Sequence, residues 1–149
     1  MDGLITHAEW VKDIEEIQGD SVDYPIIADI YLAVAKLYNM LPADESGSSD
    51  GRTAQTNATV RSVFIIDPDK KIKLILLYPM TTGRNFDEII RVLDSMQLTE
   101  KYQVATPVNW QAGGEVIIMP SVSNEEAEGL FPEGWKTITP YLRMVKKWQ

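Results

Sequence analysis

Two apolar segments joined by a short polar turn leave few folds open to this chain. Residues 59–66 (TVRSVFII) and 72–78 (IKLILLY) are apolar and rich in β-branched side chains, and the turn sequence DPDKK lies between them. The second segment is apolar on both faces, which is typical of a strand inside a sheet that is covered on both sides. A lone hairpin is at best marginally stable. Few other candidate strands precede residue 100, so we expect a sheet that needs further strands.

Two helices are predicted before the hairpin. Thr6 and Glu9 have the spacing of a capping box at the start of the first helix, and Gly19 ends its apolar periodicity. Asp29 is predicted to cap a second helix over residues 30–40.

A loop and a third helix flank the hairpin. Residues 42–57 are rich in Ser, Gly and Asp without periodicity, which predicts a surface loop. The third helix is predicted to span 85–98, with Asn85 as its cap and Glu88 at capping-box distance. The side chains that it is expected to bury are Phe86, Ile89, Leu93 and Met96.

The character of the chain changes near residue 100. A connection marked by Pro and Trp is followed by a predicted strand over 115–119, a short helix from Asn124 and a last strand over 141–145. We therefore predict two domains: residues 1–102 form an α/β core, and residues 103–149 form a small α+β arm.

Charge and hydropathy exclude several partners. The formal net charge is −8, which argues against binding to nucleic acid or an anionic membrane. The two basic clusters are interpreted as solvated surface: Lys70, Lys71 and Lys73 in the hairpin, and Arg143, Lys146 and Lys147 at the tail. No apolar run reaches the roughly 18 residues that span a bilayer. The first residues have neither a basic leader nor an apolar core, so a cytoplasmic location is expected.

The chain contains no cysteine and one histidine, His7. This composition excludes disulfides, thiolate metal sites, histidine-rich metal sites and thiol chemistry carried by these residues alone. No cofactor is expected, and no nucleophile-elbow sequence accompanies His7.

Several segments together resemble the one-cysteine peroxiredoxins of the AhpC/TSA family, from their second core helix to the C-terminus. The matching segments are HAEWVKDI, YPIIAD, TVRSVFIIDPDKKIKL, ILLYPMTTGRNFDEIIRVLDSMQLT, VATPVNW and LFPEGW. The resemblance implies a thioredoxin-like α/β core, truncated here, with a C-terminal arm used in dimer contacts. In that family the peroxidatic cysteine lies in a Pro-x-x-x-Thr-x-x-Cys loop, which this sequence does not contain. The missing strands inferred above would lie in the same upstream region.

The resemblance also implies an activity and two site residues. Family members reduce hydrogen peroxide and organic hydroperoxides, act as antioxidants in redox homeostasis, use an external thiol as reductant, and form homodimers. Arg61 is similar to the arginine that faces the peroxidatic cysteine, and Arg84 to a second arginine that supports it. A guanidinium favours the thiolate, which is the reactive form, and polarises a peroxide. On sequence alone the simpler explanation is a solvent-facing strand residue for Arg61 and a residue at the start of the third helix for Arg84. The family match reverses this for Arg61, because the strand around it is otherwise apolar, and a cation at a helix N-terminus opposes the helix dipole, which favours a site role for Arg84.

Three further residues match family positions but have simpler explanations. His7 and Trp10 fit a family His-x-x-Trp pattern, yet a capped first turn and a core anchor explain them as well. Asp69 aligns with an aspartate of a phospholipid-hydrolysing triad in some relatives, yet Asp is common in turns.

Two functions remain open: part of a thiol peroxidase, or a non-catalytic module that dimerises with a full-length relative. The missing cysteine predicts that the chain alone is inactive.

Overall fold

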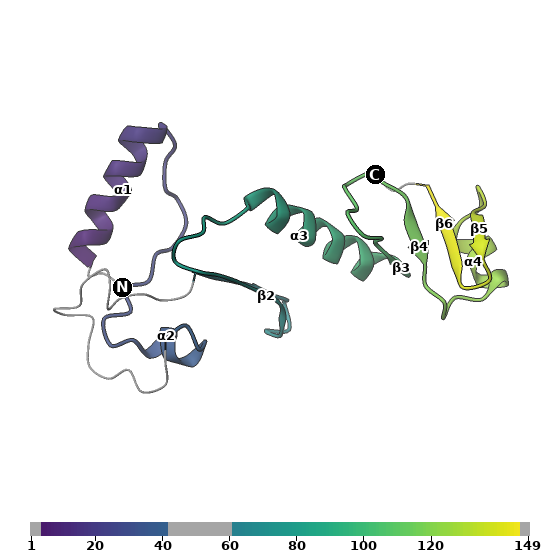
Figure 1. The fold of residues 1–149 in the computed structure, drawn as a ribbon, viewed down its shortest axis with the longest axis horizontal. Helices are drawn as coiled ribbons and strands as arrows, with labels where there is room; N and C mark the ends of the chain where they lie inside the picture. Colours follow the sequence, from purple (N-terminus) through teal and green to yellow (C-terminus); the bar gives the residue numbers. More distant parts are fainter. Residues whose placement is uncertain (1–3, 42–60, 147–149) are drawn as a thin grey trace. The chain divides into compact units, whose positions relative to one another are not determined.

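The computed structural model describes residues 4–41 and 61–146, and its chain divides into two compact units, Met1–Arg84 and Asn85–Gln149 (Figure 1). The predicted loop over 42–57 lies outside the described residues. The boundary between the two compact units falls after Arg84, before the third helix, whereas the sequence predicts a domain boundary after residue 102. The predicted core and arm, residues 1–102 and 103–149, stay a prediction. None of the helices in the described ranges is long and apolar enough to cross a bilayer.

The first helix, α1 (Leu4–Gln18), confirms the predicted helix but not its start. The helix already includes Leu4, so Thr6 lies within its first turns and cannot be the N-cap. The predicted end is confirmed: Gly19 has φ of 76°, a left-handed conformation that glycine adopts without strain.

The second helix, α2 (Ala33–Leu37), is much shorter than the predicted 30–40. Leu32 directly before it has φ of 58°, and this left-handed residue interrupts any helix that would begin at Ile30. Asp29 still satisfies the first turn, because its carboxylate accepts from the N–H groups of Val34 at 3.2 Å and Ala35 at 2.7 Å. A small core of Leu32, Ala35 and Leu41 forms around this turn.

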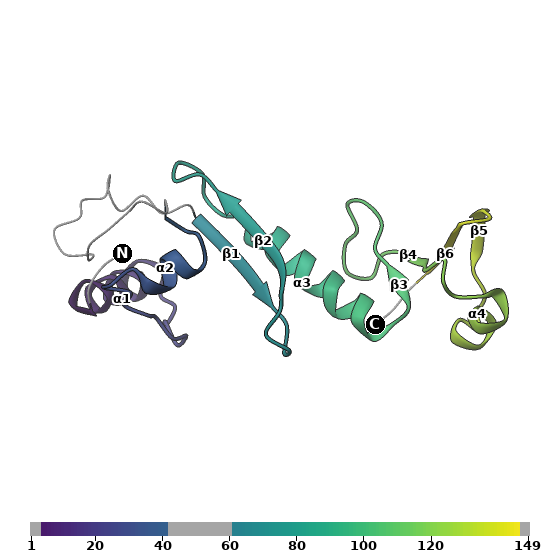
Figure 2. The ribbon, with the colours of Figure 1, turned by 90° about the horizontal axis from the view of Figure 1, so that it is seen from below.

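The predicted hairpin is confirmed, with β1 (Arg61–Ile66) and β2 (Ile72–Tyr78) antiparallel (Figure 2). Asp67 organises the turn, since its carboxylate accepts the Lys71 N–H at 2.8 Å and lies 3.2 Å from the Lys73 ammonium. Chiefly that backbone hydrogen bond holds the pKa of Asp67 below its ordinary value. The stabilisation is therefore present at neutral pH and is lost as the pH falls through the lowered pKa. Lys70, Lys71 and Lys73 are exposed, as predicted.

The hairpin leaves one apolar face open. Along β2, Leu74 and Leu76 are half-buried, whereas Ile75 and Leu77 are 49% and 62% exposed. In the described residues these two strands form a sheet of their own. This agrees with the expectation of a sheet that needs further strands.

The second unit begins with α3 (Phe86–Lys101). The predicted cap is confirmed, because the Asn85 side chain accepts from the Glu88 N–H at 3.2 Å. The predicted burial of this helix is wrong at two positions: Phe86 is 69% exposed and Leu93 is 38% exposed. Periodicity finds the apolar face of a helix, but burial also requires a partner that covers the face.

A four-stranded antiparallel sheet and a short helix complete the second unit. The sheet order is β3-β4-β6-β5, and the helix α4 (Asn124–Leu130) has a full capping box between Ser123 and Glu126. The strands are β3 (Val104–Ala105), β4 (Val116–Ile118), β5 (Lys136–Thr139) and β6 (Leu142–Val145). The core residues are Val104, Trp110, Val116, Ile118, Val122, Ala127, Phe131 and Val145. The strands β4 and β6 and the helix α4 were predicted, whereas β3 and β5 were not.

Arg143 corrects the interpretation of the tail as solvated surface. This β6 residue is only 7% exposed. Its guanidinium donates to the Asn124 Oδ1 at 2.8 Å, to the carbonyl of Met119 at 3.2 Å and to the carbonyl of Val122. The Trp135 ring lies 6.0 Å from the guanidinium carbon. Arg143 thus joins β6 to the segment that leads into α4.

We expect Arg143→Met to loosen the second unit. The substitution leaves one buried and two part-buried oxygen atoms without a charged donor, which costs about 1.5–3 kcal/mol. Hydrogen exchange of the β4 amides should then become about 10- to 100-fold faster. Lys136→Met, at an exposed position of β5, is the matched control and should leave exchange unchanged. Equal exchange in the two variants would show that the buried guanidinium is not needed.

Candidate functional site

Arg61 is held by the segment that follows its partner strand. It is the first residue of β1, pairs with Tyr78 at the end of β2, and is half-buried. After β2 the chain turns back, with the Thr82 N–H donating to the carbonyl of Pro79 at 2.9 Å. The Thr82 carbonyl accepts from Nη1 of Arg61 at 3.4 Å. This exposed hydrogen bond links the guanidinium to the returning turn at this end of the hairpin.

Arg84 follows the same turn. It is exposed and directly precedes the α3 cap residue Asn85. Both predicted site arginines belong to the first compact unit: Arg61 pairs with Tyr78, the last residue of β2, and Arg84 ends the segment that follows that strand. That either guanidinium acts on a peroxide stays a prediction.

The chemistry open to this arrangement is that of a cationic anion-stabilising site. A guanidinium presents five N–H donors in a planar fork and remains charged at any physiological pH. It can lower the pKa of a neighbouring thiol and can stabilise the oxygen anion that leaves when a peroxide bond breaks. The thiol must come from elsewhere, because the chain has no cysteine. In the described ranges, no cluster of His, Asp and Glu side chains could hold a metal ion.

The other family-matched residues show no such arrangement. His7 lies within α1 rather than at a capped first turn, and its buried Nδ1 has no hydrogen-bond partner in the structure. Trp10 is 49% exposed, so its interpretation as a core anchor is wrong for the described residues. Asp69 is exposed in the hairpin turn, which fits its simpler explanation.

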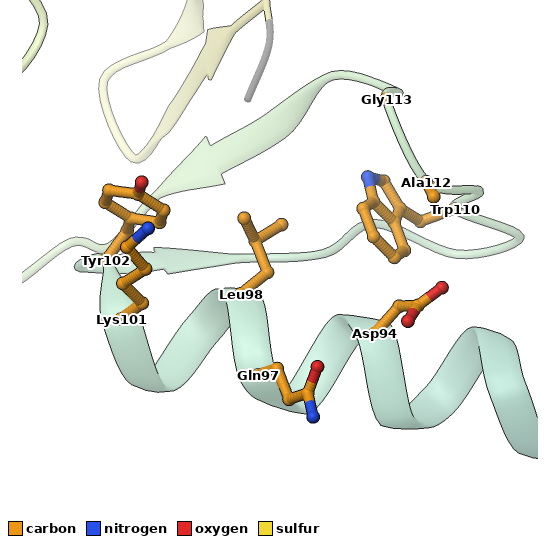
Figure 3. A pocket seen from close by; sticks show the side chains of 8 residues that line it. All are labelled: Asp94, Gln97, Leu98, Lys101, Tyr102, Trp110, Ala112 and Gly113. Atoms are coloured by element: carbon orange, nitrogen blue, oxygen red, sulfur yellow. The ribbon is translucent and has the colours of Figure 1, made fainter. Parts of the chain in front are cut away.

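The second unit has a shallow hollow of its own, of about 250 Å³, between α3 and residues 110–113 (Figure 3). Its lining includes Leu98, Trp110 and, at one end, Tyr102. Trp110 is fixed in place by its Nε1–H, which donates to the carbonyl of Gly114 at 3.3 Å, and by Arg91, which donates to its backbone carbonyl. Neither candidate arginine lines this hollow, so it carries no part of the candidate site.

Sequence reasoning missed two residues that support these structures. Thr82 contributes a backbone carbonyl, for which no side-chain pattern exists. Arg91 forms an ion pair with Glu88 at 2.6 Å, and this hydrogen bond lowers the pKa of Glu88 and raises the pKa of Arg91. Their spacing of three on one helix face was the available signal.

Two family models match the chain. The model of the AhpC/TSA family matches residues 1–75, and the model of the C-terminal domain of 1-Cys peroxiredoxin matches residues 95–134. The second match starts within α3 and covers most of the arm predicted from the sequence.

Curated relatives agree with the family models. A 1-Cys peroxiredoxin of Dictyostelium discoideum is 49% identical over 97% of the chain, and Peroxiredoxin PRX1, mitochondrial, of Saccharomyces cerevisiae is 49% identical over 95%. Peroxiredoxin-6 of Gallus gallus is 48% identical over 90%. The chain covers 56%, 53% and 59% of these three relatives, respectively, and so spans little more than half of their length.

Solved structures show the same relationship. The chain is similar to a yeast mitochondrial 1-Cys peroxiredoxin, studied for thiol resolution through the glutathione and thioredoxin systems, with a TM-score of 0.84 and 47% identity. It is equally similar, at 44% identity, to a cysteine-to-serine mutant of the peroxiredoxin 6 of Arenicola marina. These alignments cover 98% and 99% of this chain and 67% and 68% of the solved chains. The chain therefore has a thioredoxin-like fold and belongs to the AhpC/TSA family, among the 1-Cys peroxiredoxins.

Proposed function

We propose that this chain is the C-terminal part of a thiol peroxidase that reduces hydrogen peroxide and organic hydroperoxides. The peroxidatic cysteine comes from a segment outside these 149 residues. The observation that carries the proposal is the position of Arg61, which is half-buried in an apolar strand and has its Nη1 3.4 Å from the carbonyl of Thr82.

In the proposed reaction Arg61 acts on both reactants. Its charge favours the cysteine thiolate, which attacks the outer oxygen of the hydroperoxide. The sulfur–oxygen bond forms as the oxygen–oxygen bond breaks, and the departing alkoxide or hydroxide takes up a proton to leave as alcohol or water. Hydrogen bonds from the guanidinium stabilise the developing anion. An external thiol then reduces the sulfenic acid, forming a disulfide and water in two steps.

Three further assignments belong to this proposal. Arg84, two residues beyond Thr82 on the chain, acts as a positioning residue that supports the site. The active form is a homodimer, and the enzyme works in the cytoplasm without a stable membrane association. The relative in yeast is named as mitochondrial, so imaging of a fluorescent fusion is needed to distinguish the two compartments.

The second candidate function is a non-catalytic module that dimerises with a full-length relative. The absence of cysteine from the chain favours it. The coding sequence upstream of Met1 separates the two functions. An in-frame Pro-x-x-x-Thr-x-x-Cys segment there supports the peroxidase, and its absence supports the module.

We expect Arg61→Leu to impair the completed enzyme severely. The chain is combined with the upstream, cysteine-bearing segment of a 1-Cys peroxiredoxin relative, and peroxide consumption is measured with a thiol reductant. Loss of the guanidinium should lower kcat/KM by about 10²- to 10³-fold, as for other preorganised donors to a developing anion. Lys71→Leu, an exposed cation of the same hairpin, is the control and should change kcat/KM less than about twofold. Equal activity of the two variants would remove Arg61 from the site.

A further inference from the structure

The hollow between α3 and residues 110–113 carries opposite charges at its two ends (Figure 3). Asp94 lies at one end and Lys101 at the other, and both side chains line the hollow. The two residues are seven apart on α3, so they share one face of the helix, with their Cα atoms about 10 Å apart. Within the described residues neither forms an ion pair, and the Lys101 ammonium lies instead 5.0 Å from the centroid of the Tyr102 ring.

The surface between the two charges is apolar and is held in place by the fold. Leu98 is half-buried on the helix face, and the Trp110 indole, which is 5% exposed, closes the opposite side. The indole N–H donates to the carbonyl of Gly114 at 3.3 Å, and a Cβ atom at Gly114 would lie only 3.3 Å from Cδ1 of the ring. Arg91 donates to the Trp110 backbone carbonyl at 3.3 Å. Because this wall is already fixed, its ordering costs a ligand little binding free energy.

We propose that the hollow binds a short zwitterionic peptide of about three residues. The amino group of the peptide pairs with the Asp94 carboxylate, its carboxylate pairs with the Lys101 ammonium, and an apolar middle side chain covers Leu98. An extended chain spans at most about 3.3–3.6 Å per residue, so three residues match the spacing of about 10 Å between the two ends. Both pairs join a charged donor to a charged acceptor, which is the stronger class of hydrogen bond. The site lies in the second unit and does not depend on the proposed peroxidase function.

The two charges decide which ligands fit. A free amino acid carries its amino and carboxylate groups on one carbon atom, so it reaches only one end of the hollow. The terminus of a protein chain supplies one of the two charges, and a diamine or a dicarboxylate meets a like charge at one end. A short peptide with both termini free satisfies both ends, and Leu98 favours an apolar residue between them.

The test is a titration of the nitrogen-15-labelled full chain with the peptide Gly-Leu-Gly, followed by NMR chemical shifts. We expect the amides of Gln97 and Ala112 and the indole N–H of Trp110 to shift and to saturate together. Their common Kd should be on the order of 1 mM, because the hollow is shallow and both charges are partly solvated. The titration is repeated with the unlabelled upstream segment of a relative present, and the same residues should respond.

Paired changes in protein and peptide make the result decisive. Asp94→Asn should raise the Kd of Gly-Leu-Gly about three- to tenfold but leave the Kd of the N-acetylated peptide unchanged, because acetylation already removes the amino charge. Lys101→Gln should act in the same way on the free and the C-amidated peptide. Glu100→Gln and Lys136→Gln remove exposed charges outside the hollow and should leave every Kd unchanged.

Three results would overturn the proposal. The first is an absence of saturation up to about 20 mM peptide. The second is a set of shifts confined to residues outside the hollow. The third is an equal effect of Asp94→Asn on the free and the acetylated peptide, because the carboxylate would then have no contact with the amino group. A failed peroxidase assay would leave all of these measurements unaffected.

Discussion

The 149-residue chain alone should consume no hydroperoxide above the buffer rate when a thiol reductant is supplied. Turnover requires a residue that cycles between thiolate and sulfenic acid, and no residue of this chain can form one. Oxidation of a methionine consumes one equivalent of peroxide and then stops without a reductase. The measurement is peroxide loss with glutathione or thioredoxin, at equal protein mass, against a complete 1-Cys peroxiredoxin.

A matched experiment adds the upstream segment of a relative to the chain as a separate polypeptide. The cysteine-bearing segment should produce peroxidase activity, and the same segment with serine in place of cysteine should not. Activity of the unsupplemented chain within about tenfold of the complete enzyme would contradict this account. A tenfold difference in rate is only about 1.4 kcal/mol of activation free energy, which is far too little for the loss of the reacting residue.

Thermal unfolding of the chain alone should be broad, with binding of a hydrophobic dye before the transition. The open face and ends of the hairpin expose four large apolar side chains: Ile66, Ile72, Ile75 and Leu77. Full burial of one such side chain contributes about 1.5–3 kcal/mol, so incomplete burial of four loses on the order of 5 kcal/mol. The net stability of a domain is only about 5–15 kcal/mol. The first unit should therefore be partly unfolded, or should self-associate through an unpaired strand edge.

Addition of the upstream segment again supplies the control. It should sharpen the far-ultraviolet melting curve and abolish dye binding. Substitution of an apolar residue that is already exposed elsewhere, such as Val108→Ser in the second unit, should do neither. A sharp two-state transition of the monomeric chain alone, without dye binding, would show that the first unit needs no further strands.

Local signals predicted the parts of the fold that local interactions form. The hairpin follows from the turn at Asp67, and the start of α3 follows from Asn85, because each side chain satisfies a backbone N–H a few residues away. The start of α1 was missed because Thr6 offers capping chemistry that the structure does not use. The length of α2 was missed because nothing in the sequence marks Leu32 as left-handed.

Burial was harder to predict than secondary structure, and the arginines show why. Arg143 was interpreted as part of a solvated tail because Lys146 and Lys147 follow it. It lies in an apolar strand, LRMV, as Arg61 does in RSVFII, where the apolar surroundings supported the family match. The same attention to apolar surroundings would have indicated that Arg143 is buried. What it cannot supply is the set of acceptors, since carbonyls such as those of Thr82 and Val122 come from segments far along the chain.

The strand order of the second unit affects how it can be made in the cell. The strand β6 follows β4 and β5 in sequence but lies between them in the sheet, so β5 depends on it as its strand partner, and β4, which also pairs with β3, depends on it at its other edge. During synthesis β5 and one edge of β4 leave the ribosome with unpaired backbone groups, which are paired only when β6 emerges. A premature stop codon before Leu142 would separate β5 from the rest of the sheet and would remove Val145 from the core. Only a polypeptide translated through β6 can close this sheet, so a shorter product would remain incompletely folded and open to proteolysis.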